Sequence, residues 1–155
     1  MRAILLALLS TALAAEAHEI PGDVTARMFV KPEGDRLQLL VRVPLGSIRD
    51  VVFPVQGPAG YLDLDKLAPL LPDAGSLWIA SFVDLRENGA RLAKPRLVAY
   101  RISLPSDRSF ASFDEARRHF DAPPLTNADN VLAAQVFFDL AYEYRIGSDR
   151  SAFSI

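Results

Sequence analysis

His18 is the side chain of this sequence best placed to bind a metal ion. It directly follows Ala17, and cleavage between these two residues would leave a free amine beside the imidazole of His18. An amine and an imidazole on one terminal residue can together chelate copper or nickel, and Glu19 and Asp23 offer further oxygen ligands. We therefore name His18 as the candidate metal ligand, with copper or nickel as its ion. The competing interpretation is a solvated chain end that binds nothing.

His119, the other histidine, is expected at the surface and not as a second metal ligand. It lies beside Arg117 and Arg118, at the edge of the apolar stripe of a predicted helix. A Ser-His-Asp triad would have to use one of the two histidines, and neither has a convincing scaffold. The sequence holds no Gly-x-Ser-x-Gly motif, no phosphate-binding glycine loop, no His-Glu-x-x-His motif and no cysteine. We therefore predict that the protein is not an enzyme, and name no catalytic and no cofactor-binding residue.

Two other residue pairs allow a functional and a structural interpretation. Asp63 and Asp65 resemble paired carboxylates that hold a divalent cation, but leucines surround them at the start of a predicted helix, which favours helix capping. Trp78 and Phe82 would form a binding surface if they were exposed. Aromatic side chains in such a segment more often belong to the core.

A four-residue pattern occurs twice, each time after a predicted strand. Residues 106–109 and 148–151 both read Ser-Asp-Arg-Ser, after Tyr-Arg-Ile in each case. The paired loops could present Arg108 and Arg150 to one anionic ligand. We favour the alternative that Ser and Asp form side-chain-to-backbone turns that end the strands.

The first seventeen residues are typical of a secretory signal peptide. Arg2 supplies a positive charge, residues 3–15 are almost entirely apolar, and Ala15-Glu16-Ala17 matches the cleavage pattern. We expect an exported protein with residues 18–155 as its mature domain, located in the periplasm or, if the chain is part of a longer protein, on the extracytoplasmic face of the inner membrane. The apolar stretch is shorter than the roughly 20 residues of a membrane span, and no later segment qualifies.

The composition argues against nucleic acid as a partner. The formal net charge is −2, and no run of five or six basic residues occurs. Residues 18–155 have the length of one ordinary domain, which can bury a core without disulfides.

Strand and turn signals dominate the chain. Residues 25–31 and 36–43 predict a hairpin across the turn residues 32–35, and residues 76–86 and 91–104 predict a second one across Asn88-Gly89. The last predicted strand, residues 134–146, alternates between an apolar face and a face with Asp139, Glu143 and Arg145, which we expect to be wet.

Two short helices are expected between the strands. Residues 112–120 carry a capping box, Ser112 with Glu115, and a row of apolar residues. Residues 61–71 predict a second helix that Asp63 caps and Pro72 ends. The predicted fold is a mainly β, antiparallel, sandwich-like domain with one or two short helices; helices layered on one face of a sheet are the alternative.

Several segments together resemble the amino-terminal part of bacterial membrane proteins of the HupE/UreJ type. The resemblance spans essentially the whole mature chain and rests on residues 17–24 (Ala-His-Glu-Ile-Pro-Gly-Asp-Val), 29–34 (Phe-Val-Lys-Pro-Glu-Gly), 37–45 and 104–110 (Leu-Pro-Ser-Asp-Arg-Ser-Phe). It implies a signal peptide, an extracytoplasmic β-rich domain and then membrane helices, and it links the family to nickel. We expect this chain to end, at Ile155, before those helices.

The expected function is therefore that of a non-enzymatic exported domain that binds or interacts with other molecules. The resemblance implies membrane-embedded or periplasmic proteins as partners. The alternative is a periplasmic protein that handles copper or nickel through His18 at its mature amino terminus.

Overall fold

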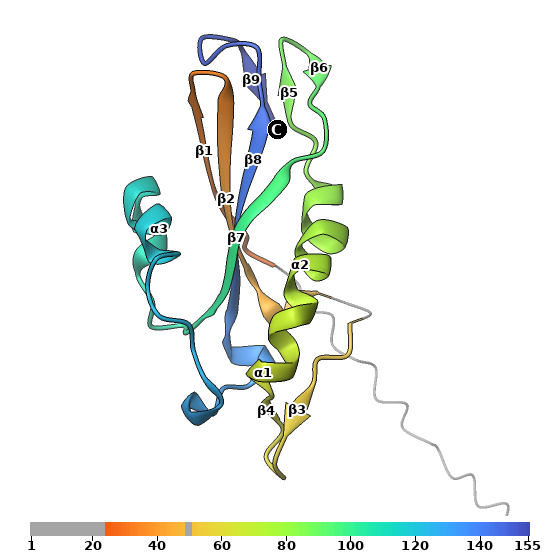
Figure 1. Cartoon of the computed structure of the whole chain (residues 1–155), viewed down its shortest axis with the longest axis vertical. Coiled ribbons are helices and arrows are strands. Elements are labelled where there is room, and N and C mark those ends of the chain that lie inside the picture. The colour runs from red at the N-terminus through yellow and green to blue at the C-terminus, as the bar shows by residue number, and fades with distance from the viewer. Residues whose placement is uncertain (1–23, 49–50) are drawn as a thin grey trace, which may run out of the picture.

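The computed structural model describes residues 24–48 and 51–155. The predicted signal peptide, His18, Glu19 and Asp23 lie outside the described residues. The described chain is built mainly from strands in three antiparallel sheets, which confirms the predicted fold class (Figure 1). None of its helices is long and apolar enough to cross a membrane.

The largest sheet has four strands in the order β1-β2-β8-β7. Its strands are β1 (Arg27–Glu33), β2 (Arg36–Pro44), β8 (Phe137–Arg145) and β7 (Arg96–Ser103). The hairpin of β1 and β2 is confirmed, with Gly34 at a φ of 62° in its turn, a conformation that glycine adopts without strain. Strand β2 ends at Pro44, as predicted. Strands β1 and β7 are the two edges of the sheet.

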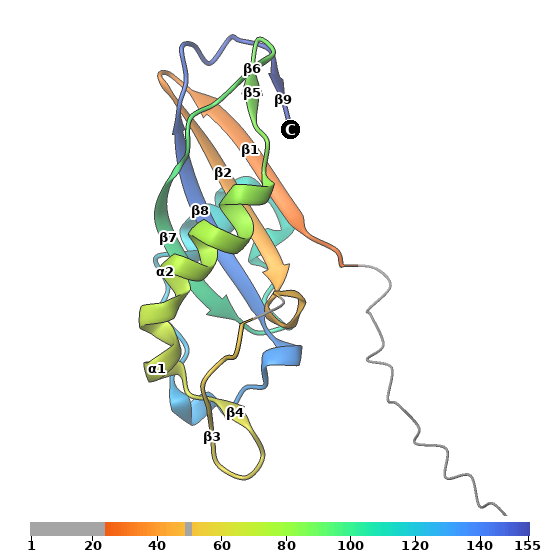
Figure 2. The same cartoon turned by 90° about the vertical axis from the view of Figure 1, so that its right-hand side faces the viewer.

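A helical segment, residues 64–82, covers one face of this sheet (Figure 2). It consists of α1 (Leu64–Leu67), a 3-10 turn (Ala68–Leu70), α2 (Leu71–Ala74), a π-helical turn (Gly75–Ile79) and a 3-10 turn (Ala80–Phe82). The side chain of Asp63 accepts a hydrogen bond from the Lys66 amide and caps α1, as predicted. The predicted stop at Pro72 is wrong, because Pro72 lies in the first turn of α2, where proline is tolerated. The strand predicted over residues 76–86 is likewise helical as far as Phe82.

Helix α3 (Phe113–His119) lies on the opposite face of the sheet (Figure 1). Ser112 caps it as predicted: the Ser112 hydroxyl accepts from the Glu115 amide and donates to the Glu115 carboxylate. A 3-10 turn (Ser109–Ala111) precedes it. The main apolar core lies between the sheet and the helical segment. A smaller apolar cluster lies beneath α3 and contains Leu40, Phe110, Ala116 and Ala141.

Strand β8 has buried residues on both of its faces. Phe138, Leu140 and Tyr142 face the main core under the helical segment. Asp139 and Ala141, on the face predicted to be wet, are only 0% and 3% exposed. The prediction is wrong for Asp139 because α3 and the preceding turn cover this part of the face, a contact that strand periodicity cannot indicate. It holds towards the end of the strand, where Glu143 is partly exposed and Arg145 is exposed.

The remaining strands are short and lie at the two ends of the sheet. Strands β3 (Val55–Gln56) and β4 (Tyr61–Leu62) pair at one end, the lower end in Figure 1. Strands β5 (Arg86–Glu87) and β6 (Ala90–Arg91) form the predicted hairpin across Asn88-Gly89 at the other end, where β9 (Phe153–Ser154) also pairs with β5. Further 3-10 turns are Leu45–Ser47, Asn127–Asp129 and Ala133–Gln135.

Candidate functional site

A cluster of six polar side chains lies between the central sheet and α3, three of them buried and three partly buried. We call it the polar cluster; its members are Arg42, Ser103, Asp107, Ser109, His119 and Asp139. Strands β2, β7 and β8 supply three members, and α3 with the loop before it supplies the other three. Long-range packing of these elements therefore assembles the cluster.

Arg42 and Asp139 form the centre of the polar cluster. The Asp139 carboxylate accepts hydrogen bonds from Nε and Nη2 of Arg42, both at 2.7 Å. The Arg42 guanidinium also lies 4.3 Å from the ring centre of Phe110 and 5.2 Å from that of Phe137. Burial lowers the pKa of Arg42, but the hydrogen bond and charge of Asp139 outweigh burial and raise it above its ordinary value.

Asp107 is the second carboxylate that faces Arg42. Its Oδ1 accepts from Arg42 Nη2 at 2.9 Å and from the amide and hydroxyl of Ser109. Burial alone would raise the pKa of Asp107, but the hydrogen bonds from Ser109 and Arg42 lower it to about 2. Asp107 is therefore a carboxylate at neutral pH.

Ser103, His119 and Asp107 lie at the distances of a Ser-His-Asp triad. Ser103 Oγ is 2.8 Å from His119 Nε2, and His119 Nδ1 is 3.3 Å from Asp107 Oδ2. The proton arrangement is the reverse of a triad, however, because the Ser103 hydroxyl donates to Asp139 Oδ2 at 2.5 Å and can then only accept from Nε2. Ser103 is also just 2% exposed. As placed, this serine is neither activated nor accessible to a substrate.

The expectation that His119 is a surface residue is wrong. Its side chain is 8% exposed, because the last turn of α3 points it back towards the sheet. The sequence offered one overlooked signal: Arg42 and Asp139 each interrupt an apolar run in the middle of a strand. Charges in such positions are rarely buried unless they are paired.

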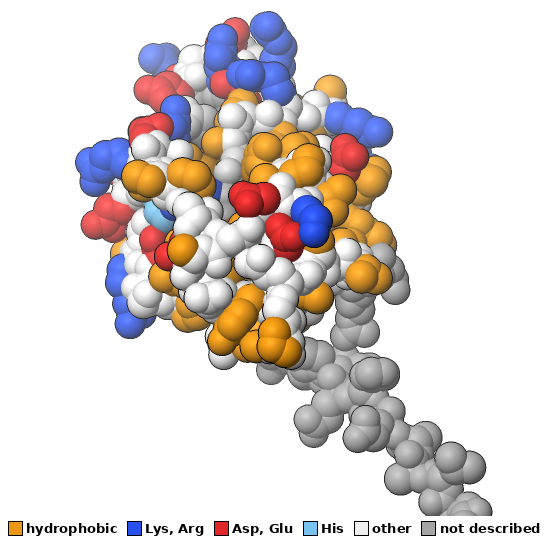
Figure 3. All heavy atoms as spheres, turned by 60° about the horizontal axis from the view of Figure 1, so that its bottom comes forward, with side chains coloured by type: hydrophobic (Ala, Val, Ile, Leu, Met, Phe, Trp, Pro, Cys, Tyr) orange, Lys and Arg blue, Asp and Glu red, His pale blue; other side chains and the backbone are white. Residues whose placement is uncertain are grey.

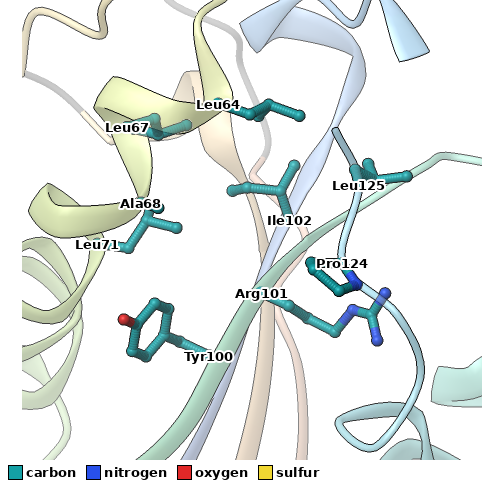
Figure 4. Close-up of a pocket in the computed structure, with 9 residues that line it drawn as sticks. All are labelled: Leu64, Leu67, Ala68, Leu71, Tyr100, Arg101, Ile102, Pro124 and Leu125. Atoms are coloured by element: carbon teal, nitrogen blue, oxygen red, sulfur yellow. The ribbon is translucent and has the colours of Figure 1, made fainter. Parts of the chain in front are cut away.

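On the other side of β7 lies an apolar pocket with a volume of about 110 Å³ (Figure 4). The helical segment, β7 and the loop before β8 form its walls. We call it the apolar pocket; it is lined by Leu64, Leu67, Ala68, Leu71, Tyr100, Arg101, Ile102, Pro124 and Leu125. It is smaller than the few hundred cubic ångströms typical of small-molecule sites. Its size therefore suits a single apolar group.

Arg101 is the one charged residue among those that line the apolar pocket. Its Nη atoms donate to the backbone carbonyls of His119, Ala122 and Pro123, which fixes the end of α3 and the loop beyond it. Its Nε–H is buried and makes no hydrogen bond within the described residues.

A larger cleft opens at the lower end of the sheet. It has a volume of about 660 Å³, and its walls come from the ends of β2, β7 and β8 and from residues 129–136. Hydrophobic side chains gather on this end of the molecule around a few charged ones (Figure 3). Residues 120–136, the loop between α3 and β8, thus line both the apolar pocket and this lower cleft. Loops of this length inside a compact domain are commonly binding loops.

The structure separates the other candidate residues of the sequence. Asp65 accepts a hydrogen bond from Asn127, so Asp63 and Asp65 serve the start of α1. Trp78 packs partly against the main core, whereas Phe82 is 77% exposed. They do not form one shared aromatic surface.

The two Ser-Asp-Arg-Ser segments lie at opposite ends of the central sheet. One follows β7, which ends opposite Phe137, and the other follows β8, which ends opposite Arg36. The length of β8 separates them by about 25 Å, so Arg108 and Arg150 cannot hold one small anion together. Both segments form side-chain-to-backbone turns, through Asp107 in the first and Ser148 in the second.

The candidate metal ligand His18 lies outside the described residues. Within residues 24–48 and 51–155, no group of three or more His, Cys, Asp or Glu side chains could hold a metal ion. The two ring nitrogens of His119 face different carboxylates, Nδ1 facing Asp107 and Nε2 facing Asp139. The three side chains therefore do not converge on one point where a metal ion could bind.

Comparisons of the chain with protein-family models, with curated proteins and with solved structures gave no match.

Proposed function

We propose that this protein is a non-enzymatic exported domain that binds other molecules through the loop of residues 120–136. The observation that carries the proposal is the apolar pocket, which this loop closes against β7 and the helical segment. Its walls are mostly apolar, and Arg101 is the one charged residue among those that line it. A mostly apolar cavity with a few polar groups is the usual form of a binding site.

The polar cluster supports binding over catalysis. Its two hydroxyl groups both donate to carboxylates, Ser103 to Asp139 and Ser109 to Asp107, and Ser103 is also buried. The cluster instead holds α3 against the sheet, and Arg101 extends that attachment to Pro123 and the loop. In this proposal the cluster supplies the rigid scaffold on which the binding loop depends.

The signal peptide pattern and the resemblance to HupE/UreJ-type proteins support an extracytoplasmic location. We propose the periplasm, or the outer face of the inner membrane if the domain belongs to a longer protein. Membrane-embedded or periplasmic proteins are the proposed partners.

Xenon binding followed by methyl NMR tests the apolar pocket directly. Xenon enters small apolar cavities, and we expect it to shift the methyl signals of Leu64, Leu71, Ile102 and Leu125 in the full chain. Ala68→Phe should abolish these shifts, because Ala68 is exposed and lines the pocket.

Ala90→Phe is the matched control, since Ala90 is exposed in β6 at the other end of the sheet, and it should leave the xenon shifts unchanged. Absence of shifts in the unsubstituted protein would contradict the proposed site.

Copper or nickel handling by His18 is the second candidate function. It is favoured by the sequence position of His18 directly after the predicted cleavage site.

A further inference from the structure

Strand β7 has a free edge along the central sheet. It pairs with β8 on one side only, and no backbone hydrogen bond joins its other side to any described residue. Figure 1 looks onto this edge, with α3 on one side of it and the helical segment on the other. Residues 96–101 are partly or fully exposed, whereas Ile102 and Ser103 are buried. The open part of the edge therefore runs from Arg96 to Arg101.

Three cavities flank this edge. The apolar pocket lies beside Tyr100, and a second cavity of about 200 Å³ lies beside Pro95, also against the helical segment. A third, of about 160 Å³, lies on the α3 side against Val98. Successive residues of a strand point to opposite faces, so an added strand would place alternate side chains towards the two kinds of cavity.

The charges beside the edge are predominantly basic. Lys94 lines the cavity at Pro95, and Arg96 and Arg117 line the cavity at Val98. The acid there, Glu143, already pairs with both Arg36 and Arg96, at 3.1 and 2.9 Å. Arg117 makes no ion pair with any described residue. The α3 side of the edge therefore favours a carboxylate.

We propose that the free edge of β7 binds an extended segment of a partner protein by strand addition. The segment carries apolar side chains that face the helical segment and acidic side chains that face Arg117. Backbone hydrogen bonds to β7 supply affinity, and the flanking cavities select the side chains. This inference rests on the proposed function, because it assigns the occupant of the apolar pocket.

Two features argue against a second copy of this chain as the occupant. Pairing β7 with another β7 would bring two sets of Lys94, Arg96 and Arg117 together, and like charges repel. The bulge at Val98, which has no partner on β8, also shortens the regular part of the edge. A short edge needs side-chain pockets for affinity, and the pockets beside β7 meet that need.

A designed peptide tests the proposal. The two cavities against the helical segment lie beside Pro95 and Tyr100, five residues apart along the chain. The bulge at Val98 takes up one of these residues, so an added strand spans the two cavities in about four residues, or about 13 Å. The probe is a fluorescent nine-residue peptide with leucine at positions 3 and 7, glutamate at positions 2, 4 and 6, and threonine elsewhere. We expect the full-length protein to bind it at least about tenfold more tightly than a peptide with lysine in place of glutamate. N-methylation of alternate backbone amides should abolish binding, because it removes the donors of strand addition.

Two neighbouring arginines of α3 provide matched protein variants. Arg117→Glu should weaken binding by about fivefold or more, because it reverses the charge that faces the acidic side chains. Arg118→Glu makes the same change one residue further, at an exposed residue that does not line the three cavities, and should alter affinity less than about twofold. Hydrogen exchange should show slower exchange of β7 amides in the complex.

The outcomes separate this inference from the proposed function. If xenon enters the apolar pocket but no peptide slows exchange in β7, strand addition is wrong and the proposed site stands. If neither probe binds, both are wrong. Equal binding of the glutamate and lysine peptides overturns the charge argument, and concentration-dependent dimerisation through β7 in sedimentation experiments overturns the assigned occupant.

Discussion

Arg42 and Asp139 lie directly opposite each other on the two central strands of the sheet, and their side chains join through two hydrogen bonds of 2.7 Å. They are 3% and 0% exposed. A fully buried charge is costly unless a partner of opposite charge compensates it. The pair therefore determines how α3 can pack, because every other member of the polar cluster is arranged around these two charges.

Removal of one member of this pair should be strongly destabilising. We expect Arg42→Met to lower the free energy of unfolding by about 3–5 kcal/mol, because it leaves the Asp139 carboxylate buried without its cation. The double variant Arg42→Met with Asp139→Leu should recover much of that loss. Urea unfolding measures both effects.

The control for this pair is Arg36→Met, which removes an exposed arginine from its ion pair with Glu143. It should cost less than about 1 kcal/mol. Equal losses for the Arg42 and Arg36 variants would contradict the buried-pair argument.

Asp107 should make stability fall at acidic pH. Its pKa is about 2 in the folded protein against an ordinary 3.8, so the unfolded chain takes up its proton first as pH falls. The contribution of Asp107 is complete well above pH 4 and is lost as pH falls from 3.8 towards 2. Asp107→Asn should therefore cost about 2 kcal/mol at pH 7 and much less at pH 2.

Unfolding free energies of the parent and Asp107→Asn, measured between pH 7 and pH 2, check this expectation. Asp121→Asn, at an exposed aspartate beyond α3, serves as the control and should follow the parent curve. If the difference in unfolding free energy between the parent and Asp107→Asn does not change with pH, the ionised form of Asp107 does not stabilise the fold.

Ser103 should have a structural role. Ser103→Ala removes a hydrogen bond to the buried Asp139 carboxylate, and we expect a loss of about 1–3 kcal/mol in the free energy of unfolding. A fluorophosphonate reagent should not modify Ser103 in the folded protein. Ser106→Ala, at an exposed position, is the stability control, and modification of Ser103 detected by mass spectrometry would favour an enzyme after all.

Gly75 marks the closest approach of the helical segment to the sheet. A Cβ at this position would lie 2.5 Å from Cδ2 of Leu140, which is fully buried and has little room to move. We expect Gly75→Ala to cost about 1–3 kcal/mol, and Ser76→Ala, at the exposed next residue, to cost little. Combining Gly75→Ala with Leu140→Val should cost less than the sum of the two single changes; strict additivity in thermal or urea unfolding would argue against this contact.

His18 should bind copper and nickel only when it is the terminal residue. We expect the chain that begins at His18 to bind either ion at least about tenfold more tightly than one with a single alanine added before it, because the addition removes the amine from the chelate. Calorimetric titration of each ion into both forms measures this, and equal affinities would rule out the terminal site. Mass spectrometry of the exported protein establishes whether His18 is the natural terminus.

Local patterns in the sequence determined much of the secondary structure. The hairpin of β1 and β2, the Asn88-Gly89 turn and the Ser112 cap of α3 each depend on residues that are close together in the chain. Their energies are local, so residue type and spacing were sufficient to predict them. The helical segment was mispredicted beyond Leu71 because a proline in the first turn of a new helix looks the same as a proline that ends one.

Only the tertiary structure decided which charged residues are buried and where a partner could bind. Asp139 and His119 resembled solvated residues in the sequence, and they became part of the polar cluster because α3 folds back onto β2, β7 and β8. The apolar pocket likewise combines residues 64–71, 100–102 and 124–125, which are far apart in the chain. Burial and cavity shape depend on how distant elements pack, and a one-dimensional pattern of polar and apolar residues does not contain that information.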